Sequence, residues 1–300
     1  MTPTLTLSNG VPMPILGLGT SHQGGYSHAA VVHALKNAGY THIDTAERYG
    51  TEASICEDVK MSGVSREKIF ITTKAWPSSY GYEELKKSLQ CSLRNLGTDY
   101  VDLYLLHWPD VPLHFSDRTQ CLRETWKAME ELYAAGLCKA IGVSNFLIKH
   151  LEEIFEICTV KPHVNQIEFH PYCYPKQLIS FCWKHDIVVE GYCPLAKGEI
   201  LTNKNLRAPI ETIALKHGKT LAQVLVRWSV QHGVVTIPKS TKLDRVEENI
   251  AVFDFELSEG EMLLMDGLCD VTQVKATWDP QHMSSYKRDI SNPVRDNNSE

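Results

Sequence analysis

Short apolar segments alternate with longer amphipathic segments along most of the chain. Stretches with helical spacing, such as 27–39, 83–97 and 124–136, each end in the glycine expected just past a helix terminus. Continuous apolar runs separated by helices are typical of parallel strands that are covered on both faces. The apolar segments number eight: 15–19, 40–46, 68–74, 101–107, 138–145, 163–170, 187–194 and 234–240.

Eight strand–helix units within 300 residues predict a closed (β/α)8 barrel, the TIM-barrel architecture of the α/β class. Asn9-Gly10 lies between two alternating runs in segment 5–16 and predicts an N-terminal β-hairpin. We expect this hairpin to cap the bottom of the barrel, away from the chemistry. An open doubly wound sheet is the alternative. Its dinucleotide signature is missing, because residue 22, where a third glycine would follow Gly17 and Gly19, is histidine.

Composition and charge narrow the class of protein further. No linker rich in proline, glycine or serine divides the chain, so we expect one domain over residues 1–300 with a polar tail at about 290–300. The net charge of -6 gives no reason to expect binding to nucleic acid or to an anionic membrane, and no run approaches the ~18 apolar residues that span a bilayer. The N-terminus lacks a signal-peptide pattern, and the nine cysteines form no Cys-x-x-Cys pair. We therefore expect a cytoplasmic protein with reduced thiols, and a monomer because no heptad pattern is present.

Polar residues stand at the ends of three consecutive predicted strands. Asp44 ends the second strand, with Tyr49 following in the loop, while Lys74 ends the third strand and His107 the fourth. In a (β/α)8 barrel the working groups lie at the C-terminal ends of the strands. A free tyrosine has a pKa of about 10 and is a poor acid at neutral pH. We expect Lys74 to lower the pKa of Tyr49, Asp44 to hold Lys74, and His107 to hydrogen-bond a substrate oxygen.

Each of these four residues also has an ordinary structural interpretation. A strand-end aspartate often caps the next helix, a lone lysine usually faces solvent, and a histidine or tyrosine often simply packs. Their coincidence on neighbouring strand ends favours the functional interpretation. The chain has no His-Glu-x-x-His and no Gly-x-Ser-x-Gly motif, and its histidines show no ligand pair at a strand end. We therefore expect no metal site, which disfavours the alternative of a metal-dependent hydrolase.

A series of motifs surrounds these residues in a constant order. They are GLGT (17–20), HIDTAERYG (42–50), TTKAW (72–76), DLYLLHWP (102–109), IGVSNF (141–146), NQIEFHP (165–171), GYCPLAKG (191–198), IPKS (237–240) and RVEEN (245–249). With these motifs the chain resembles the aldo-keto reductases over almost its whole length. The resemblance implies reduction of aldehydes or ketones to alcohols by a nicotinamide cofactor bound without a Rossmann fold. It also implies that Tyr49 donates the proton, that Lys74 and Asp44 support it, and that His107 orients the carbonyl.

The same resemblance implies a set of cofactor-binding residues. Ser144, Asn145 and Gln166 would bind the carboxamide of the nicotinamide, and Tyr192 would stack against its ring. The full set is Gly19, Thr20, Asp44, Ser144, Asn145, Gln166, Tyr192, Cys193, Leu195, Lys239, Ser240, Arg245, Glu248 and Asn249.

A cluster of cations and donors near the end of the motif series decides between the two nicotinamide cofactors. Lys239, Ser240 and Arg245 suit the 2'-phosphate of the adenosine, so we predict NADPH rather than NADH. The structural alternative for this segment is a helix start in which Thr241 and Asp244 form a capping box. Both interpretations are compatible, because a helix N-terminus also favours a phosphate.

Substrate contacts are expected from the loops at the same end of the barrel. The loop after His107 and the loop after the seventh strand are short for the family, which indicates an open pocket for small or varied aldehydes and ketones. Trp278 and Tyr286 are candidates to fold over the mouth of the pocket. A barrel that binds NADPH but serves as a regulatory or structural partner is the alternative function, and the intact set of four residues disfavours it. The residues expected to contact the substrate are Ser21, Trp76, His107 and Trp108.

Overall fold

The computed structural model describes residues 2–21, 23–112, 115, 117–278 and 280. Eight parallel strands form one sheet in which each strand pairs with its neighbour along the chain. Seven of the strands lie within their predicted segments, and β5 extends one residue past the segment 68–74, so the prediction of eight strands is confirmed. The strands are β3 (Leu18–Gly19), β4 (His42–Asp44), β5 (Phe70–Ala75), β6 (Leu103–Leu106), β7 (Ile141–Ser144), β8 (Val164–Glu168), β9 (Val188–Tyr192) and β10 (Val235–Thr236).

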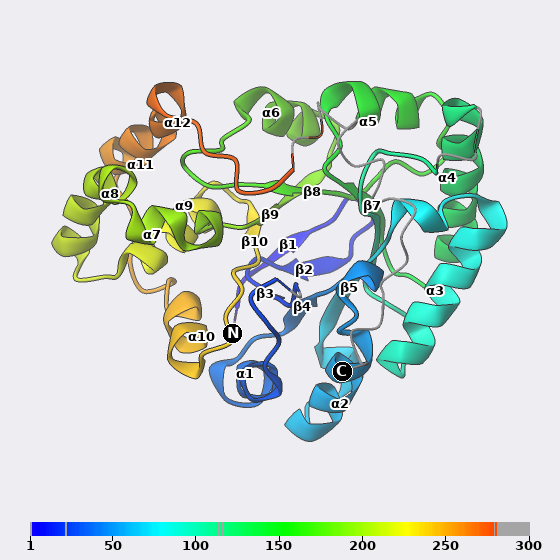
Figure 1. The fold of residues 1–300 in the computed structure, drawn as a ribbon, viewed down its shortest axis with the longest axis horizontal. Helices are drawn as coiled ribbons and strands as arrows, with labels where there is room; N and C mark the ends of the chain where they lie inside the picture. The colour runs from blue at the N-terminus through cyan, green and yellow to red at the C-terminus, as the bar shows by residue number, and fades with distance from the viewer. Residues whose placement is uncertain (1, 22, 113–114, 116, 279, 281–300) are drawn as a thin grey trace, which may run out of the picture.

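Hydrogen bonds between the first and last strands of this sheet close it into a barrel. Thr236 of β10 forms a parallel bridge with Leu16, just before β3. The Gly17 amide donates to the Thr236 carbonyl at 2.9 Å, and the Thr236 amide donates to the Ile15 carbonyl at 2.9 Å. The helices surround the closed strands (Figure 1), which confirms the expected (β/α)8 architecture.

The outer helices follow the amphipathic stretches of the sequence. In α3, Leu85, Leu89 and Leu93 recur on one buried face, and Gly97 ends the helix with a φ of 61°. No helix in the described part of the chain is long and apolar enough to cross a membrane. The helices are α1 (His28–His33), continued by a π-helical turn at Ala34–Ala38, α2 (Glu52–Ser62), α3 (Tyr82–Leu96), α4 (Arg118–Ala134), α5 (Ile148–Phe155), α6 (Lys176–Lys184), α7 (Glu199–Thr202), α8 (Lys204–His217), α9 (Leu221–Gln231), α10 (Leu243–Ile250), α11 (Glu259–Asp266) and α12 (Leu268–Val271).

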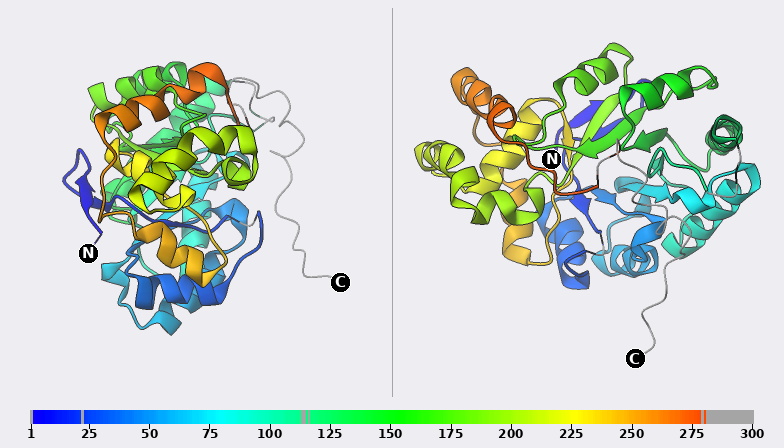
Figure 2. Two further views of the ribbon diagram at one scale, coloured as in Figure 1. Left: turned by 90° about the vertical axis from the view of Figure 1, so that its left-hand side faces the viewer. Right: turned by 45° about the horizontal axis from the view of Figure 1, so that its top comes forward.

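The predicted hairpin closes one end of the barrel. Its strands, β1 (Thr4–Thr6) and β2 (Pro12–Pro14), pair antiparallel, and Gly10 in the turn has a φ of 87°. Leu7 and Met13 are buried against the residues that begin the barrel strands, so the hairpin caps the N-terminal end of the barrel, as expected (Figure 2). The barrel residues in this apolar cluster are Phe70, Leu103, Leu105, Ala140, Val164 and Val235.

Side chains alternate between the inside and the outside of the barrel, as β5 illustrates. Ile71 and Ala75 point outward and pack in the apolar core between the strands and the helices. Phe70 points inward and packs in the apolar cluster next to the hairpin. Thr72 and Lys74 share the inward face with Phe70 and lie successively closer to the C-terminal end of the strand. The interior is therefore apolar near the hairpin and polar toward the other end.

The tight packing inside the barrel makes Gly142 of β7 a sensitive position. A Cβ atom there would lie 2.8 Å from Leu105 Cδ2 and closer still to the Val164 carbonyl oxygen. We predict that Gly142→Ala lowers the free energy of unfolding by about 2 to 3 kcal/mol, as overpacked cores typically do. Urea unfolding followed by circular dichroism measures this change.

The matched control is Gly260→Ala in α11, where the added Cβ meets nothing within 4 Å. Its expected effect is a stabilisation of less than about 1 kcal/mol. Equal stability of the two variants would show that the barrel interior tolerates the added methyl group and would contradict the prediction.

Candidate functional site

A cavity of about 830 Å³ opens at the C-terminal end of the barrel. It gathers most of the residues that the sequence predicted for catalysis, cofactor binding and substrate contact. Two predicted residues, Thr20 and Lys74, do not line it but lie buried directly behind the lining. The predicted residues that line the cavity are Gly19, Ser21, Asp44, Tyr49, Trp76, His107, Trp108, Ser144, Asn145, Gln166, Tyr192, Cys193, Leu195, Lys239, Ser240, Arg245, Glu248 and Asn249.

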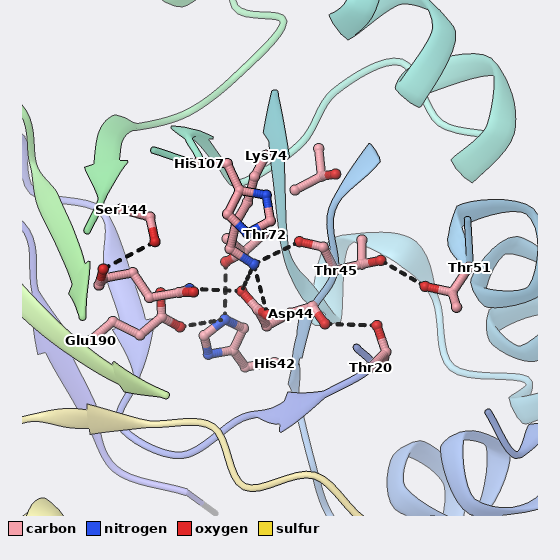
Figure 3. Close-up of polar contacts among 12 residues, drawn as sticks. Thr20, His42, Asp44, Thr45, Thr51, Thr72, Lys74, His107, Ser144 and Glu190 are labelled. Atoms are coloured by element: carbon pink, nitrogen blue, oxygen red, sulfur yellow. Dashed lines mark hydrogen bonds and ion pairs between the residues drawn. The ribbon is translucent and has the colours of Figure 1, made fainter. Parts of the chain in front are cut away.

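A buried ion pair lies behind the floor of this cavity. The ammonium of Lys74 donates to both carboxylate oxygens of Asp44, at 2.8 and 2.7 Å, and to the Thr45 carbonyl at 2.8 Å. Lys74 is fully buried and Asp44 nearly so. Thr20 holds the Asp44 backbone, since its hydroxyl donates to the Asp44 carbonyl at 2.8 Å (Figure 3).

Tyr49 and His107 lie against this ion pair on the cavity side. Tyr49 ends a 3-10 turn, Glu47–Tyr49, that follows β4. The Lys74 ammonium lies 5.1 Å from the centroid of the Tyr49 ring, and the rings of Tyr49 and His107 meet edge-on at 5.6 Å. The structure thus brings the four residues predicted for catalysis into one cluster, drawn from the ends of three neighbouring strands.

The expected lowering of the Tyr49 pKa is wrong. Burial of the side chain raises the pKa of Tyr49 to about 12, and the charge of Lys74 offsets only part of this increase. Desolvation therefore outweighs the ammonium at this position. Tyr49 is therefore a weaker acid than a free tyrosine, and both are protonated at neutral pH.

Two further polar side chains, His42 and Glu190, lie inside the barrel beneath the ion pair, and neither was singled out from the sequence. The side-chain nitrogen of Gln166 donates to Asp44 Oδ2 and to Glu190 Oε2, both at 2.8 Å. His42 Nε2 lies 3.1 Å from Thr72 Oγ1 and 3.5 Å from Glu190 Oε1 (Figure 3). A carboxylate within the apolar segment 187–194 is the sequence signal that would have identified Glu190.

The predicted carboxamide-binding residues form a hydrogen-bonded group on one wall. The Ser144 hydroxyl donates to the Gln166 carbonyl at 3.0 Å, and the Asn145 side chain donates to the His107 carbonyl at 3.0 Å. Asn145 has a φ of 65° and accepts from the Tyr192 hydroxyl at 2.7 Å. Left-handed backbone at a non-glycine residue persists only where surrounding contacts impose it, and such residues cluster at functional sites.

The chain after α12 runs inward toward the strands (Figure 1), and its residues Thr277 and Trp278 reach the cavity. Glu168 at the end of β8 accepts from the amides of Ala276 and Thr277, at 2.6 and 3.1 Å, and from the Thr277 hydroxyl. Trp278 then lines the cavity, with its ring 6.3 Å from that of Trp76 and 5.9 Å from that of Trp108. Trp278 thus lies where we expected it, whereas Tyr286 and the predicted tail at 290–300 lie outside the described residues.

Glu168, His170 and Cys173 bring their ligand atoms within 4.8 Å of one another, a spacing that a metal ion would suit. Their surroundings fit a different role. The ammonium of Lys275 lies 3.3 Å from Glu168 Oε2 and 3.8 Å from Cys173 Sγ, where it would repel a metal cation. Burial also raises the pKa of Cys173 to about 11, which keeps it a thiol. The cluster therefore anchors the C-terminal segment.

The predicted capping box at the start of α10 is wrong. The helix begins at Leu243 with Lys242 as its N-cap, and no side chain caps it there. Ser240 Oγ accepts instead from the Lys242 amide at 3.1 Å, which shapes the turn before the helix. The N-terminus of α10 thus remains adjacent to Lys239, Ser240 and Arg245, which all line the cavity.

Comparison with known proteins decides the family. A sequence model of the aldo/keto reductase family matches residues 15–270. This chain belongs to the aldo/keto reductase family. It is 45% identical over 267 residues to glyoxal reductase of Bacillus subtilis, an alignment that covers 88% of this chain and 92% of that relative. The resemblance noted in the motifs is thereby confirmed, and this aldo/keto reductase is an oxidoreductase.

Solved structures of other members share the fold of this aldo/keto reductase. The aldo/keto reductase from Brucella melitensis superposes with a TM-score of 0.80 at 40% identity. The superposition covers 89% of this chain and 100% of the other. A silkworm (Bombyx mori) aldo-keto reductase, solved in complex with NADP, superposes with a TM-score of 0.84 at 29% identity, covering 96% of this chain and 97% of the other.

The ion pair behind the cavity floor provides a test of its energetic role. We predict that Lys74→Met lowers the free energy of unfolding by about 3 to 5 kcal/mol, because it leaves Asp44 buried without its cation. The double variant Lys74→Met/Asp44→Asn removes both charges and should recover much of that loss. Urea unfolding of the three proteins measures the effect.

Lys176→Met is the matched control, because Lys176 pairs with Asp270 at 3.1 Å on the surface. That exposed pair should contribute little to stability. If Lys74→Met were no more damaging than Lys176→Met, the Asp44–Lys74 pair would not have the role assigned to it.

Proposed function

We propose that this aldo/keto reductase uses NADPH to reduce aldehydes and ketones to alcohols, with Tyr49 as the proton donor. The observation that carries the proposal is the meeting of Tyr49 and His107 in one cavity, above the buried Lys74–Asp44 pair. Tyr49 is a neutral acid with the fixed cation Lys74 beside it, and His107 is a second polar group. This combination suits protonation of a carbonyl oxygen.

The residues that line the cavity fit a nicotinamide dinucleotide phosphate. Ser144, Asn145 and Gln166 lie at or next to β7 and β8, whereas Lys239 follows β10 and Arg245 lies in α10; all five line the cavity. A volume of about 830 Å³ leaves room for a cofactor with a small substrate. When bound, the reduced nicotinamide supplies a hydride to the carbonyl carbon. The silkworm relative solved with NADP supports the same choice of cofactor here.

The charge of Lys74 supports proton donation by Tyr49. The hydroxyl is protonated at neutral pH, as in any tyrosine, and burial raises its pKa to about 12, which weakens it as an acid, whereas the charge of Lys74 acts in the opposite direction. As the proton leaves, negative charge develops on the phenol oxygen, and the Lys74 ammonium favours that charge. Asp44 fixes the position of Lys74, so no rearrangement is needed during the transfer. His107, edge-on to Tyr49, would hydrogen-bond the same substrate oxygen and orient it.

The apolar walls of the cavity support small carbonyl substrates. The rings of Trp76 and Trp108 each pack against the ring of Trp278, and together they would exclude water from the reacting carbonyl. The relative that is a glyoxal reductase points in the same direction. We infer that aldehydes and ketones with a short or flat apolar part are the preferred class.

The role of Tyr49 is tested by Tyr49→Phe, which keeps the ring and removes the hydroxyl. We predict that kcat for reduction of small aldehydes falls by about 100-fold or more, because general acid catalysis is lost, while NADPH binding persists. Loss of reduced nicotinamide absorbance measures turnover, and fluorescence quenching measures binding.

Tyr133→Phe is the control for this experiment, because the Tyr133 hydroxyl contacts Asn9 of the N-terminal hairpin at the opposite end of the barrel. Its turnover should match that of the unaltered enzyme. Full activity in Tyr49→Phe would contradict the assignment. NADPH binding without turnover of any carbonyl in the unaltered protein would favour a regulatory or structural role instead.

Cofactor choice is tested at Arg245. We predict that Arg245→Leu weakens NADPH binding about 10-fold or more, because a charge-assisted contact to the 2'-phosphate is lost, and leaves NADH binding nearly unchanged. Arg94→Leu, at an exposed arginine of α3, should alter neither affinity. An equal loss of NADPH and NADH affinity in Arg245→Leu would place the 2'-phosphate elsewhere. Titration calorimetry measures both affinities.

A further inference from the structure

Among the described residues, the barrel interior beneath the cavity contains two buried carboxyl groups, Asp44 and Glu190, and one buried cation, Lys74. Asp44 and Glu190 each accept a hydrogen bond from the same nitrogen of Gln166, both at 2.8 Å, so their oxygens lie close together. Lys74 donates to Asp44 and to the Thr45 carbonyl, and among the described contacts it makes no hydrogen bond to Glu190. If both carboxyl groups were ionised, the buried cluster would carry a net negative charge.

The other groups that face Glu190 do not supply a compensating cation. His42, from β4, faces Glu190, with its Nε2 at 3.5 Å from Glu190 Oε1. Burial lowers the pKa of His42 to about 3, so the ring is neutral. Thr72 from β5 and Gln166 from β8 are uncharged neighbours. Glu190 Oε1 has no hydrogen-bond partner among the described residues, and His42 Nε2 lies within hydrogen-bond distance of Thr72 Oγ1 instead.

The electrostatic surroundings agree with this arrangement of charges. Burial and, next, the negative charge of Asp44 raise the pKa of Glu190 to about 8. Glu190 is therefore mostly protonated at neutral pH and titrates in the slightly alkaline range.

Glu190 also helps to fix the orientation of Gln166, which lines the cavity. Both hydrogens of the Gln166 amide nitrogen are used, one on Asp44 and one on Glu190. The amide is thereby held with its nitrogen inside the barrel. Its oxygen is left as the atom available to a group in the cavity, such as the NH2 of a carboxamide.

We propose that Glu190 is a positioning residue that acts in its protonated form: it turns the Gln166 oxygen toward the nicotinamide carboxamide and keeps the buried cluster electrically neutral. This inference rests on the proposed function, since it concerns the same cofactor. Ionisation of Glu190 releases its proton to solvent and places a negative charge behind the cavity floor. Because the nicotinamide ring is cationic when oxidised and neutral when reduced, that charge favours NADP+ over NADPH.

The test compares the unaltered enzyme with Glu190→Gln, which keeps the shape and cannot ionise. The Kd values of NADPH and NADP+ are measured by quenching of tryptophan fluorescence between about pH 7 and about pH 9.5, on either side of the Glu190 pKa. In the unaltered enzyme the ratio Kd(NADP+)/Kd(NADPH) should fall several-fold as pH rises. In Glu190→Gln this change should disappear, whereas other groups that titrate, including the cofactor phosphate, contribute equally to both proteins.

An infrared difference spectrum between the same two proteins, without cofactor, reports the proton directly. A protonated-carboxyl stretching band should be present at about pH 6.5 in the unaltered enzyme and lost by about pH 9.5. Because this measurement needs neither turnover nor cofactor, it separates a failure of this inference from a failure of the proposed function. If the unaltered enzyme failed to bind NADPH at any pH while the infrared band still titrated, the proposed function and the cofactor part of this inference would be overturned. The protonation of Glu190 would then still stand.

Glu190→Leu separates charge from orientation, because leucine is neutral but offers no acceptor to Gln166. This variant should bind both cofactors more weakly at all pH values, and the ratio Kd(NADP+)/Kd(NADPH) should no longer depend on pH. Absence of the infrared band at neutral pH would overturn the inference. So would a Kd ratio with the same pH dependence in Glu190→Gln as in the unaltered enzyme.

Discussion

The ion pair between Lys74 and Asp44 is the interaction on which the site of this barrel depends. Removing two charges from water costs more than a single contact recovers, so such a pair persists only with good geometry and further hydrogen bonds. Here Lys74 makes three hydrogen bonds, and Asp44 accepts a further one from Gln166. The strand register that aligns β4 with β5 brings the two residues together. An apolar cluster near the hairpin seals the other end of the barrel and keeps water away from the pair.

Around this one cation the barrel assembles acids that retain their protons. Burial raises the pKa of both Tyr49 and Glu190, although the two side chains lie on opposite sides of the pair. Tyr49 faces the cavity and would donate its proton to a substrate, whereas Glu190 faces the interior and would keep its proton for electrostatic balance. The low polarity of the interior produces both effects, because it disfavours any charge that lacks its own partner.

A comparison of Glu168 with Glu190 shows how strongly local hydrogen-bond donors determine the pKa of a buried carboxyl group. Both are buried glutamates on neighbouring strands. Burial acts to raise the pKa of Glu168. The pKa is nevertheless held at about 2 by the hydrogen bond from His170, the charge of Lys275 and the hydrogen bonds from Thr277 and Ala276. Glu190 accepts from Gln166 and faces the negative charge of Asp44. One glutamate therefore serves as an anion that anchors the chain over the cavity mouth, and the other as a neutral acid beneath its floor.

The sequence by itself determined the eight strands, the N-terminal hairpin and the strand-end positions of the candidate catalytic residues. These features follow from local periodicity and from short motifs, which act over a few residues. Only the tertiary structure decided that the pKa of Tyr49 is raised, that Glu190 lies beneath Gln166, and that Glu168 binds the amide of Ala276, more than one hundred residues away. The start of α10 also differed from its local pattern. Desolvation and long-range hydrogen bonds depend on which groups the fold packs around a side chain, and no local pattern contains that information.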